Sequence, residues 1–347
     1  MRIALTADPE IPVPPIHYGG IERIVDMLAR GLVARGHEVT VFAHAKSATA
    51  GRLIPWPGRT SRSKGDTVRN AAMLARQALC GRFDLMHSFS RLAYLAPFLP
   101  APIPKLMSYQ RGITRRSVRL GHQLSRGTLW FSAISRHLMA GVADIGTWRL
   151  VFNGVPLALY DFCSDPGPDA PFVFLGRIEE IKGPHLAIEI ARRAGIPLTI
   201  AGNVPAEHRH FFETEVKPRI DGVQIRYLGP VDDTAKSELL RGARALLMPV
   251  LWDEPFGIVM AEAMACGTPV IGFARGAVPE VVEHGVTGFV ADDIEGLVAG
   301  VRQLHRIERT ACRRRVERLF SDSVVVDAYE RVYREMLVSV RRRRLQD

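Results

Sequence analysis

The sequence predicts an α/β protein made of two Rossmann-like domains, each built around a parallel sheet. Short apolar segments alternate with amphipathic segments along most of the chain, which is typical of repeated βαβ units. The alternation is interrupted once, at a stretch rich in Pro, Gly and Asp, and then starts again. Since 347 residues also exceed what one hydrophobic core usually covers, we expect two domains of similar architecture.

The first half of the chain opens with a complete βαβ unit. We predict an apolar strand over 1–7, an amphipathic helix over 19–37 and a second strand over 38–43. Further strand-like segments, separated by helical stretches, are predicted over 83–89, 104–110 and 129–135. These elements define a first domain over residues 1–155.

The second half repeats this architecture after a linker over 153–171. Its predicted strands cover 171–178, 197–202, 223–229, 244–250 and 268–273, and its predicted helices cover 182–195, 235–243 and 256–267. We assign residues 156–323 to a second domain. Residues 324–347 are predicted to form a helix with a basic tail that packs back toward the first domain.

Charge is distributed unevenly between the two halves. Residues 1–160 hold 21 Lys and Arg against 8 Asp and Glu, a balance of +13, and residues 161–347 hold 25 against 28, a balance of −3, which sum to the net +10. A basic half suits an anionic small molecule, membrane surface or nucleic acid, but it is also compatible with a solvated basic face.

The chain has no run of eighteen apolar residues and no apolar stretch after a basic start, so we expect neither a membrane span nor a signal peptide. Its four cysteines are far apart and include no C-x-x-C pair, which argues against a zinc site or a disulfide framework. We therefore expect a cytoplasmic protein with reduced thiols.

Two carboxylates in the segment 253–272 point to a ligand site. Glu254 precedes a predicted helix, whose free N–H groups favour an anion such as phosphate, and Glu262 lies in an otherwise apolar run of that helix. Because Glu254 would repel a phosphate, it is better placed to bind sugar hydroxyls, and Glu262 a diol such as ribose. The alternative is a helix cap together with a buried glutamate that has a protein partner.

Two further segments could bind a diphosphate. Arg177 and Lys182 follow the first strand of the second domain, at the sheet edge where open α/β sheets bind ligands. Alternatively, these two cations pair with Glu179 and Glu180. In the first domain, two glycines after the first strand could let backbone N–H groups approach a phosphate; they are Gly19 and Gly20.

Four motifs stand out together: GGIER after the first strand, FNGV near the domain junction, FLGRIEEIKG, and the segment from EPFGIVMAEAMACGTPVIG to GVTGFV, in which seven residues separate two glutamates. With these motifs the chain resembles the family 4 retaining glycosyltransferases of GT-B fold. This resemblance implies two Rossmann-like domains that face each other across a cleft. The first domain would lie on the acceptor side, and the second would hold a nucleotide-sugar donor.

The resemblance implies roles for the matching residues. Arg177 and Lys182 would bind the diphosphate, Glu254 with the backbone of Phe256, Gly257 and Ile258 would surround the hexose and phosphate, and Glu262 would bind ribose. Gly19 and Gly20 would close over the phosphate from the other side. The nucleotide-sugar is a substrate, so no cofactor is implied, and protein cations and helix ends take the place of a metal.

The chemistry that the family implies begins with cleavage of the bond between the anomeric carbon and the diphosphate. Positive charge builds on the sugar and negative charge on the leaving phosphate, so Arg177 and Lys182 should matter most in the transition state. Glu254, at the hexose, is the third catalytic candidate. Retention follows from same-face attack, in which the leaving phosphate accepts the proton of the acceptor. Many relatives have a histidine in the first domain where this chain has Gln110, which can only form hydrogen bonds. His17 and His87 could compensate, or they are structural residues.

In this interpretation, the acceptor side of the protein is its basic first domain. Residues 111–127 could form a basic amphipathic helix that suits a phosphorylated acceptor or anionic lipid headgroups, so peripheral contact with the cytoplasmic membrane face is a further possibility. Nucleic acid is not expected as a partner, because no nucleic-acid-binding module is present.

The function predicted is transfer of a hexose from a nucleotide-diphosphate sugar, with UDP-sugar favoured, to an unidentified acceptor. Two alternatives remain open from the sequence. One is a nucleotide-sugar epimerase, which changes the sugar without an acceptor. The other is an inactive nucleotide-sugar-binding or membrane-docking protein, for which Gln110 is the one hint.

Overall fold

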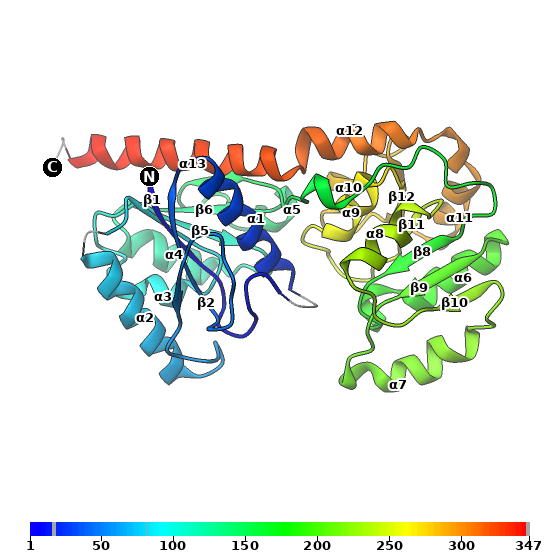
Figure 1. Cartoon of the computed structure of the whole chain (residues 1–347), viewed down its shortest axis with the longest axis horizontal. Helices are drawn as coiled ribbons and strands as arrows, with labels where there is room; N and C mark the ends of the chain where they lie inside the picture. Colours follow the sequence, from blue (N-terminus) through cyan, green and yellow to red (C-terminus); the bar gives the residue numbers. More distant parts are fainter. Residues whose placement is uncertain (16–18, 81, 345–347) are drawn as a thin grey trace. The chain divides into compact units, whose positions relative to one another are not determined.

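The protein is divided into two units, each with its own parallel sheet. The computed structural model describes residues 1–15, 19–80 and 82–344. Unit 1 consists of Met1–Asn153 and Asp322–Asp347, and unit 2 consists of Gly154–Ser321 (Figure 1). The chain therefore passes from unit 1 to unit 2 and returns. Within each unit all described strand pairs are parallel, which confirms the predicted α/β class.

The sheet of unit 1 has seven strands in the order β3-β2-β1-β4-β5-β6-β7. The strands are β1 (Arg2–Thr6), β2 (Glu38–Ala43), β3 (Arg52–Pro55), β4 (Leu85–Ser88), β5 (Lys105–Tyr109), β6 (Leu129–Ala133) and β7 (Trp148–Leu150). The strand order reverses beside β1. In such sheets ligands bind outside the carboxyl ends of the strands near this point.

Helices cover both faces of this sheet (Figure 1). They are α1 (Gly20–Ala34), α2 (Lys64–Leu79), α3 (Leu92–Leu95), α4 (Arg115–Leu124), α5 (Arg136–Met139) and α13 (Asp322–Arg344). One hydrophobic core lies under α2, α3 and α4, where strand residues such as Phe42 and Phe131 meet Leu74, Tyr94 and Val118. Burial of these large side chains stabilises the unit.

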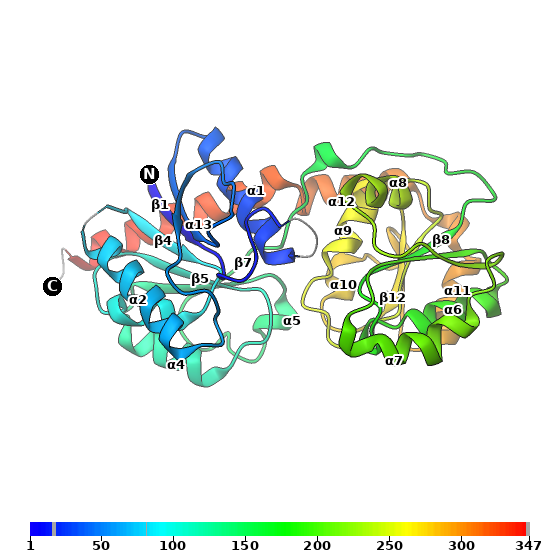
Figure 2. The ribbon, with the colours of Figure 1, turned by 60° about the horizontal axis from the view of Figure 1, so that its bottom comes forward.

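Helix α13 packs against α1 on the other face, and Figure 2 shows this arrangement from a second direction. Gly31 permits the close approach, because a Cβ there would lie only 2.5 Å from Cγ2 of Val326. An ion-pair cluster joins the same elements, with Glu330 of α13 bonded to Arg35 at 2.8 Å and to His37 at 2.5 Å. The carboxy-terminal segment is thus part of unit 1.

Unit 2 has a six-stranded sheet in the order β10-β9-β8-β11-β12-β13. The strands are β8 (Phe172–Leu175), β9 (Leu198–Ala201), β10 (Ile225–Tyr227), β11 (Leu246–Met248), β12 (Val270–Phe273) and β13 (Gly288–Ala291). The α-helices are α6 (Pro184–Ala194), α7 (Arg209–Phe211), α8 (Asp233–Arg241), α9 (Ile258–Ala265), α10 (Val278–Val281), α11 (Ile294–Arg302) and α12 (Arg309–Leu319). Its order again reverses beside the first strand, β8.

The basic segment 111–127 contains α4, as expected. Within the described residues, no helix is both long enough and apolar enough to cross a membrane.

Candidate functional site

Helix α9 begins at a turn whose backbone favours glycine. Gly257 precedes the first helical residue with a φ of +71°, and a Cβ there would lie 2.7 Å from Cε of Met260. Phe256 anchors the turn, since its buried ring meets the ring of Phe320 edge-on with centroids 5.4 Å apart. The backbone through Ile258 is thereby fixed at the amino end of an eight-residue helix, where N–H groups favour an anion.

Glu254 and Lys182, predicted from separate segments, form one ion pair. Nζ of Lys182 lies 2.7 Å from Oε2 of Glu254, and the Trp252 indole N–H donates to the same oxygen at 3.0 Å. Lys182 also lies over the Trp252 ring, 4.6 Å from its centroid. Glu254 is only 7% exposed, so its charge is balanced inside the protein, as a buried carboxylate requires.

Two glycines allow the loops of this pair to meet. A Cβ on Gly183, whose φ is +76°, would lie 2.0 Å from the carbonyl oxygen of Pro249. A Cβ on Gly276 would lie 2.4 Å from the backbone nitrogen of Glu254. The N–H of Ala277 then donates to the Glu254 carbonyl at 2.7 Å. Backbone packing therefore requires the glycine that follows Lys182.

Arg177 lies in the loop after β8 and pairs with Glu179. Nη2 of Arg177 lies 2.9 Å from Oε1 of Glu179. Glu179 is 3% exposed, and its other oxygen, Oε2, lies 3.3 Å from Nε2 of His208. The pairing of Arg177 with Glu179 was one of the alternatives left open by the sequence. Lys182 instead pairs with Glu254, so the two cations of this loop have different partners.

Glu262 has protein partners inside unit 2. Its Oε1 accepts hydrogen bonds from the Tyr160 hydroxyl at 2.7 Å and from Nζ of Lys236 at 2.6 Å, and Glu262 is 5% exposed. Lys236 lies 5.7 Å from the centroid of the Tyr160 ring and also 3.2 Å from Asp233. These contacts explain how an apolar helix carries a charge. Both bonds use one oxygen of the carboxylate.

The glycine turn of unit 1 lies at the start of α1. Gly19 precedes the helix, and a Cβ there would lie 2.6 Å from Cβ of Pro15 and 2.9 Å from Oε2 of Glu22. Gly20 is the first helical residue, and nothing lies within 4 Å of an added Cβ. Close packing therefore requires glycine at Gly19 alone. His17, an acceptor-side candidate, falls outside the described residues.

His87 belongs to the core of unit 1, which corrects its assignment as an acceptor-side candidate. Its side chain is fully buried, Nδ1 lies 2.6 Å from the Tyr333 hydroxyl, and Nε2 lies 2.6 Å from Oγ of Ser108. Burial lowers the pKa of His87 well below its ordinary value, so the ring is neutral near pH 7. Both ring nitrogens are already bonded, which leaves neither for a substrate.

Gln110 lies at the edge of a cavity in unit 1. Its Oε1 accepts from Nδ2 of Asn153 at 2.8 Å, whereas its own Nε2 and Oδ1 of Asn153 are buried without a hydrogen-bond partner in the described part of the chain. The cavity of about 430 Å³ lies beyond the carboxyl ends of β1, β4 and β5, and is lined by Asp8, Ser90, Arg91, Tyr109, Gln110 and Arg111 among others. We call it the carboxyl-edge cavity.

Asp8 is the acidic group of the carboxyl-edge cavity. Its Oδ1 is buried with no hydrogen-bond partner among the described residues, and Oδ2 lies 3.8 Å from Nη2 of Arg111. Burial, together with nearby Glu10, raises the pKa of Asp8 to about 6, against the opposing influence of Arg111 and Arg91. A carboxyl of this kind changes its charge close to neutral pH, as proton acceptors in active sites often do.

Sequence reasoning missed three residues of these arrangements: Asp8, Tyr160 and Lys236. The signal for Asp8 was its place directly after the first strand, at the ligand-binding edge of an open sheet. The signal for Lys236 was the buried charge of Glu262, which required a cation somewhere in the chain. No three or more His, Cys, Asp or Glu side chains of the described residues form a group that could hold a metal ion.

Comparisons with known proteins match both halves of the chain. Residues 165–318 match the family model for glycosyl transferases group 1, and residues 18–145 match that for glycosyltransferase family 4. The chain is 28% identical to a glycogen synthase of Mycobacterium tuberculosis, over 92% of each protein. It is 27% identical to a phosphatidyl-myo-inositol mannosyltransferase of Mycolicibacterium smegmatis, over 87% of this chain and 84% of that protein.

A solved structure shares the fold. An Anabaena protein, crystallised in complex with UDP and glucose, superposes with a TM-score of 0.74 over 96% of this chain and 99% of its own, at 16% identity.

Proposed function

Because the chain belongs to the family 4 glycosyltransferases, with the GT-B fold, and therefore transfers a sugar from a nucleotide-sugar, we propose that the sugar is a hexose carried by UDP. The observation that carries the proposal is the meeting of Lys182, Glu254 and the amino end of α9 in unit 2. It provides a cation and N–H groups for a diphosphate beside a carboxylate for sugar hydroxyls. The UDP complex of the Anabaena protein is consistent with this choice of nucleotide.

We assign the diphosphate to Lys182, Arg177 and the N–H groups of residues 256–258. In the protein, Lys182 contacts Glu254 and Arg177 contacts Glu179, and ammonium and guanidinium groups are the N–H donors that bond phosphate oxygens. Since negative charge grows on the leaving phosphate, these contacts strengthen in the transition state. With its charge balanced by Lys182, Glu254 can accept hydrogen bonds from hexose hydroxyls beside a phosphate.

We assign the ribose to Glu262. Its Oε1 is occupied by Tyr160 and Lys236, and the second oxygen, Oε2, remains to accept the two ribose hydroxyls. The contact with Lys236 would hold this carboxylate in place. The protein partners of Glu262 and a ribose contact are therefore compatible.

We assign the acceptor to the carboxyl-edge cavity of unit 1. Asp8 and Gln110 offer polar atoms that have no hydrogen-bond partner among the described residues, which suits a polyhydroxylated acceptor, while Arg91 and Arg111 suit an anionic substituent on it. The names of the two relatives point to different acceptors, glycogen for one and phosphatidyl-myo-inositol for the other.

In the reaction, the acceptor oxygen forms a bond to the anomeric carbon on the face that the diphosphate leaves. The bond from that carbon to the diphosphate oxygen breaks, and the acceptor proton passes to the leaving phosphate. The configuration of the sugar is thereby retained. Arg177 and Lys182 stabilise the charge of the departing diphosphate.

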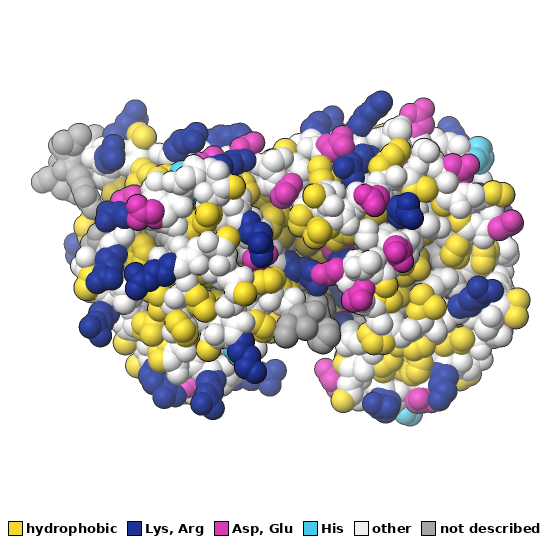
Figure 3. Space-filling view, in the orientation of Figure 1, with side chains coloured by type: hydrophobic (Ala, Val, Ile, Leu, Met, Phe, Trp, Pro, Cys, Tyr) yellow, Lys and Arg dark blue, Asp and Glu magenta, His cyan; other side chains and the backbone are white. Residues whose placement is uncertain are grey.

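An anionic membrane surface is a proposed location of the acceptor. Helix α4 exposes Leu120 and Leu124, 54% and 46% accessible, next to the exposed Arg116 and Arg119. In Figure 3, dark-blue cationic side chains outnumber magenta acidic ones on the visible surface of unit 1. Apolar and basic side chains on one helix suit peripheral binding to anionic lipids.

Thermal unfolding with UDP, GDP, ADP and dTDP tests the donor assignment. A nucleotide at a hundred times its dissociation constant stabilises the folded protein by about 2.7 kcal/mol. We expect UDP to stabilise the wild type, Glu262→Ala to lose most of that effect, and Glu213→Ala, an exposed residue of unit 2, to keep it. A different nucleotide in place of UDP would correct the base, and stabilisation by none would contradict the proposal.

A further inference from the structure

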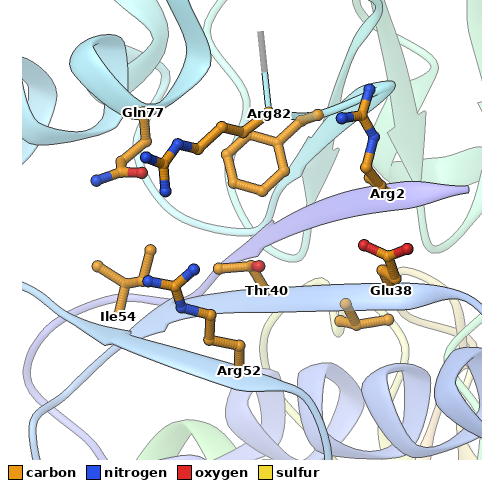
Figure 4. Close-up of a pocket in the computed structure, with 9 residues that line it drawn as sticks. Arg2, Glu38, Thr40, Arg52, Ile54, Gln77 and Arg82 are labelled. Carbon is orange, nitrogen blue, oxygen red and sulfur yellow. The ribbon is translucent and has the colours of Figure 1, made fainter. Parts of the chain in front are cut away.

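A second hollow of unit 1 lies at the opposite edge of its sheet from the carboxyl-edge cavity. It has a volume of about 540 Å³ and is lined by residues at the starts of β1, β2 and β3 and by the end of α2 and the segment after it (Figure 4). We call it the amino-edge pocket. Since β1 runs from Arg2 in this pocket to Thr6 near the carboxyl-edge cavity, the length of the strand separates the two.

The pocket exists because α2 covers only part of the sheet face. Phe42 packs in the core under α2, and Thr40, two residues earlier in β2, lies on the same face. Thr40 is paired with Arg52 of β3, and Ile54 follows on that face. Helix α2 ends at Leu79, so the starts of β2 and β3 are left as an open wall of the pocket.

Two arginines extend into this pocket, and no ion pair joins either of them to a described residue. Arg52 rises from β3, and Arg82 reaches in from the opposite wall, with Gln77 of α2 beside them (Figure 4). Both arginines are exposed, and within the described ranges neither has an ion-pair or hydrogen-bond partner for its guanidinium. Arg2, at the other end of the pocket, is instead bonded to Asp84 at 3.0 Å.

The remaining charges do not neutralise Arg52 and Arg82. Glu38 is the single carboxylate among the nine described lining residues, and it lies at the Arg2 end (Figure 4). The carboxyl end of α2 contributes a partial negative charge of about one half. Two full positive charges on facing walls therefore outweigh it, and they repel each other unless an anion lies between them.

We propose that the amino-edge pocket binds a phosphate-bearing anion between Arg52 and Arg82. Guanidinium groups form paired hydrogen bonds with phosphate oxygens, and Gln77 supplies a further amide donor. Ile54 and Phe83 provide an apolar wall for the group that carries the phosphate. The site is separate from the donor and acceptor assignments and does not depend on them.

The ligand has two possible sources, a soluble phosphate ester or the headgroup of a lipid. The second follows from a neighbouring hollow of about 340 Å³, which shares Phe83 with the amino-edge pocket and is otherwise lined mainly by apolar residues, including Ile103, Leu337 and Val340. A phosphate at the arginines could thus carry an acyl chain that lies against these residues. The chemistry recognised at Arg52 and Arg82 is the same in both cases.

Calorimetric titration with inorganic pyrophosphate tests the soluble source. We compare the wild type with Arg52→Gln/Arg82→Gln, and with Arg226→Gln/Arg302→Gln, which removes two exposed arginines of unit 2. We expect the first pair to weaken binding at the amino-edge pocket at least tenfold and the control pair to leave it unchanged. Pyrophosphate bound at the donor site would appear equally in all three proteins.

Sedimentation with phosphatidylcholine vesicles, with and without phosphatidic acid, tests the lipid source with the same three proteins. A loss confined to pyrophosphate identifies a soluble ligand, and a loss of vesicle binding identifies a headgroup. Arg52→Lys/Arg82→Lys, which keeps the charges, should retain part of the binding. If Arg52→Gln/Arg82→Gln matches the wild type in both assays, or if the control pair loses as much binding, the two arginines are only a solvated surface and the proposal is overturned.

Discussion

The residues of unit 2 that we assign to the donor and the carboxyl-edge cavity of unit 1 differ in how their buried carboxylates are paired. In unit 2 each buried carboxylate has a cation in contact, Glu254 with Lys182 at 2.7 Å and Glu262 with Lys236 at 2.6 Å. In unit 1 the carboxylate of Asp8 has its nearest ion-pair contact at 3.8 Å, and its Oδ1 lacks a hydrogen bond in the part of the chain that the structure describes.

This difference teaches that the two regions depend on ligands to different degrees. Paired buried charges are stable in the protein alone, and they lose stability when one partner is removed. Unpaired buried polar groups lower the stability of the protein alone, and a ligand that bonds them restores it. Substitutions in the two regions should therefore change stability in opposite directions.

The largest effect is expected for Lys182→Met. If Lys182 binds the diphosphate as we propose, removal of this ammonium withdraws positive charge from the leaving group, and donor turnover should fall about 10²–10³-fold. Hydrolysis of the nucleotide-sugar without an acceptor provides the assay, because it requires no knowledge of the acceptor. Lys217→Met is the matched control, since Lys217 lies in unit 2 in an exposed pair with Glu213. Equal hydrolysis rates for the two variants would show that Lys182 does not contribute to catalysis.

The next largest effect is expected on the free energy of unfolding, from the coupling between Glu262 and Lys236. Glu262→Gln leaves a largely buried ammonium with Asp233 as its one remaining carboxylate partner among the described residues, so we expect it to lower the free energy of unfolding by about 2–4 kcal/mol. Glu262→Gln/Lys236→Met removes both charges and should recover at least about 1 kcal/mol of this loss in urea unfolding. The exposed pair Glu213→Gln/Lys217→Met should show a coupling below about 0.5 kcal/mol. Additive effects at Glu262 and Lys236 would show that the buried pair is not coupled.

The predicted fold could be reached from sequence because its signals are local. Apolar strands and amphipathic helices such as α1 show their period within a few residues. Several elements were not predicted, among them β3, β7, β13, α2, α11 and α12. Two of these have weak local signals: β3 is a four-residue edge strand that ends in Pro55, and α2 is too polar along its length to show a clear apolar face. Their positions depend on the sheet and core that they complete.

The site could be predicted only as separate residues. The sequence singles out Glu254, Glu262 and the two cations of the loop after β8 as site candidates. The pairing of Lys182 with Glu254 joins residues 72 positions apart, and that of Tyr160 with Glu262 joins residues 102 apart. The environment of His87 was equally hidden, because its partner Tyr333 lies 246 positions away. Ion pairs and burial arise from tertiary contacts, so residue type and spacing cannot determine them.

The smallest effect is expected for Asp8→Asn, which should raise the free energy of unfolding where the unit 2 substitution lowers it. Burial raises the pKa of Asp8 from 3.8 to about 6 in the folded protein, so between these values the folded state binds a proton that the unfolded state does not. The stability of the wild type should therefore contain a contribution that falls as the pH rises from 3.8 to about 6. Above pH 6 the full penalty of the buried charge is present.

Because asparagine carries no charge, Asp8→Asn should be more stable than the wild type by about 1–3 kcal/mol at pH 7.5, with the difference vanishing below about pH 4. Urea unfolding at a series of pH values measures this. Asp84→Asn is the control of opposite sign: although burial opposes it, the hydrogen bonds from Arg2 lower the pKa of Asp84, so this variant should be less stable at pH 7.5. If Asp8→Asn also destabilises the protein at pH 7.5, the Asp8 carboxylate is satisfied without a ligand, and the contrast between the two regions is lost.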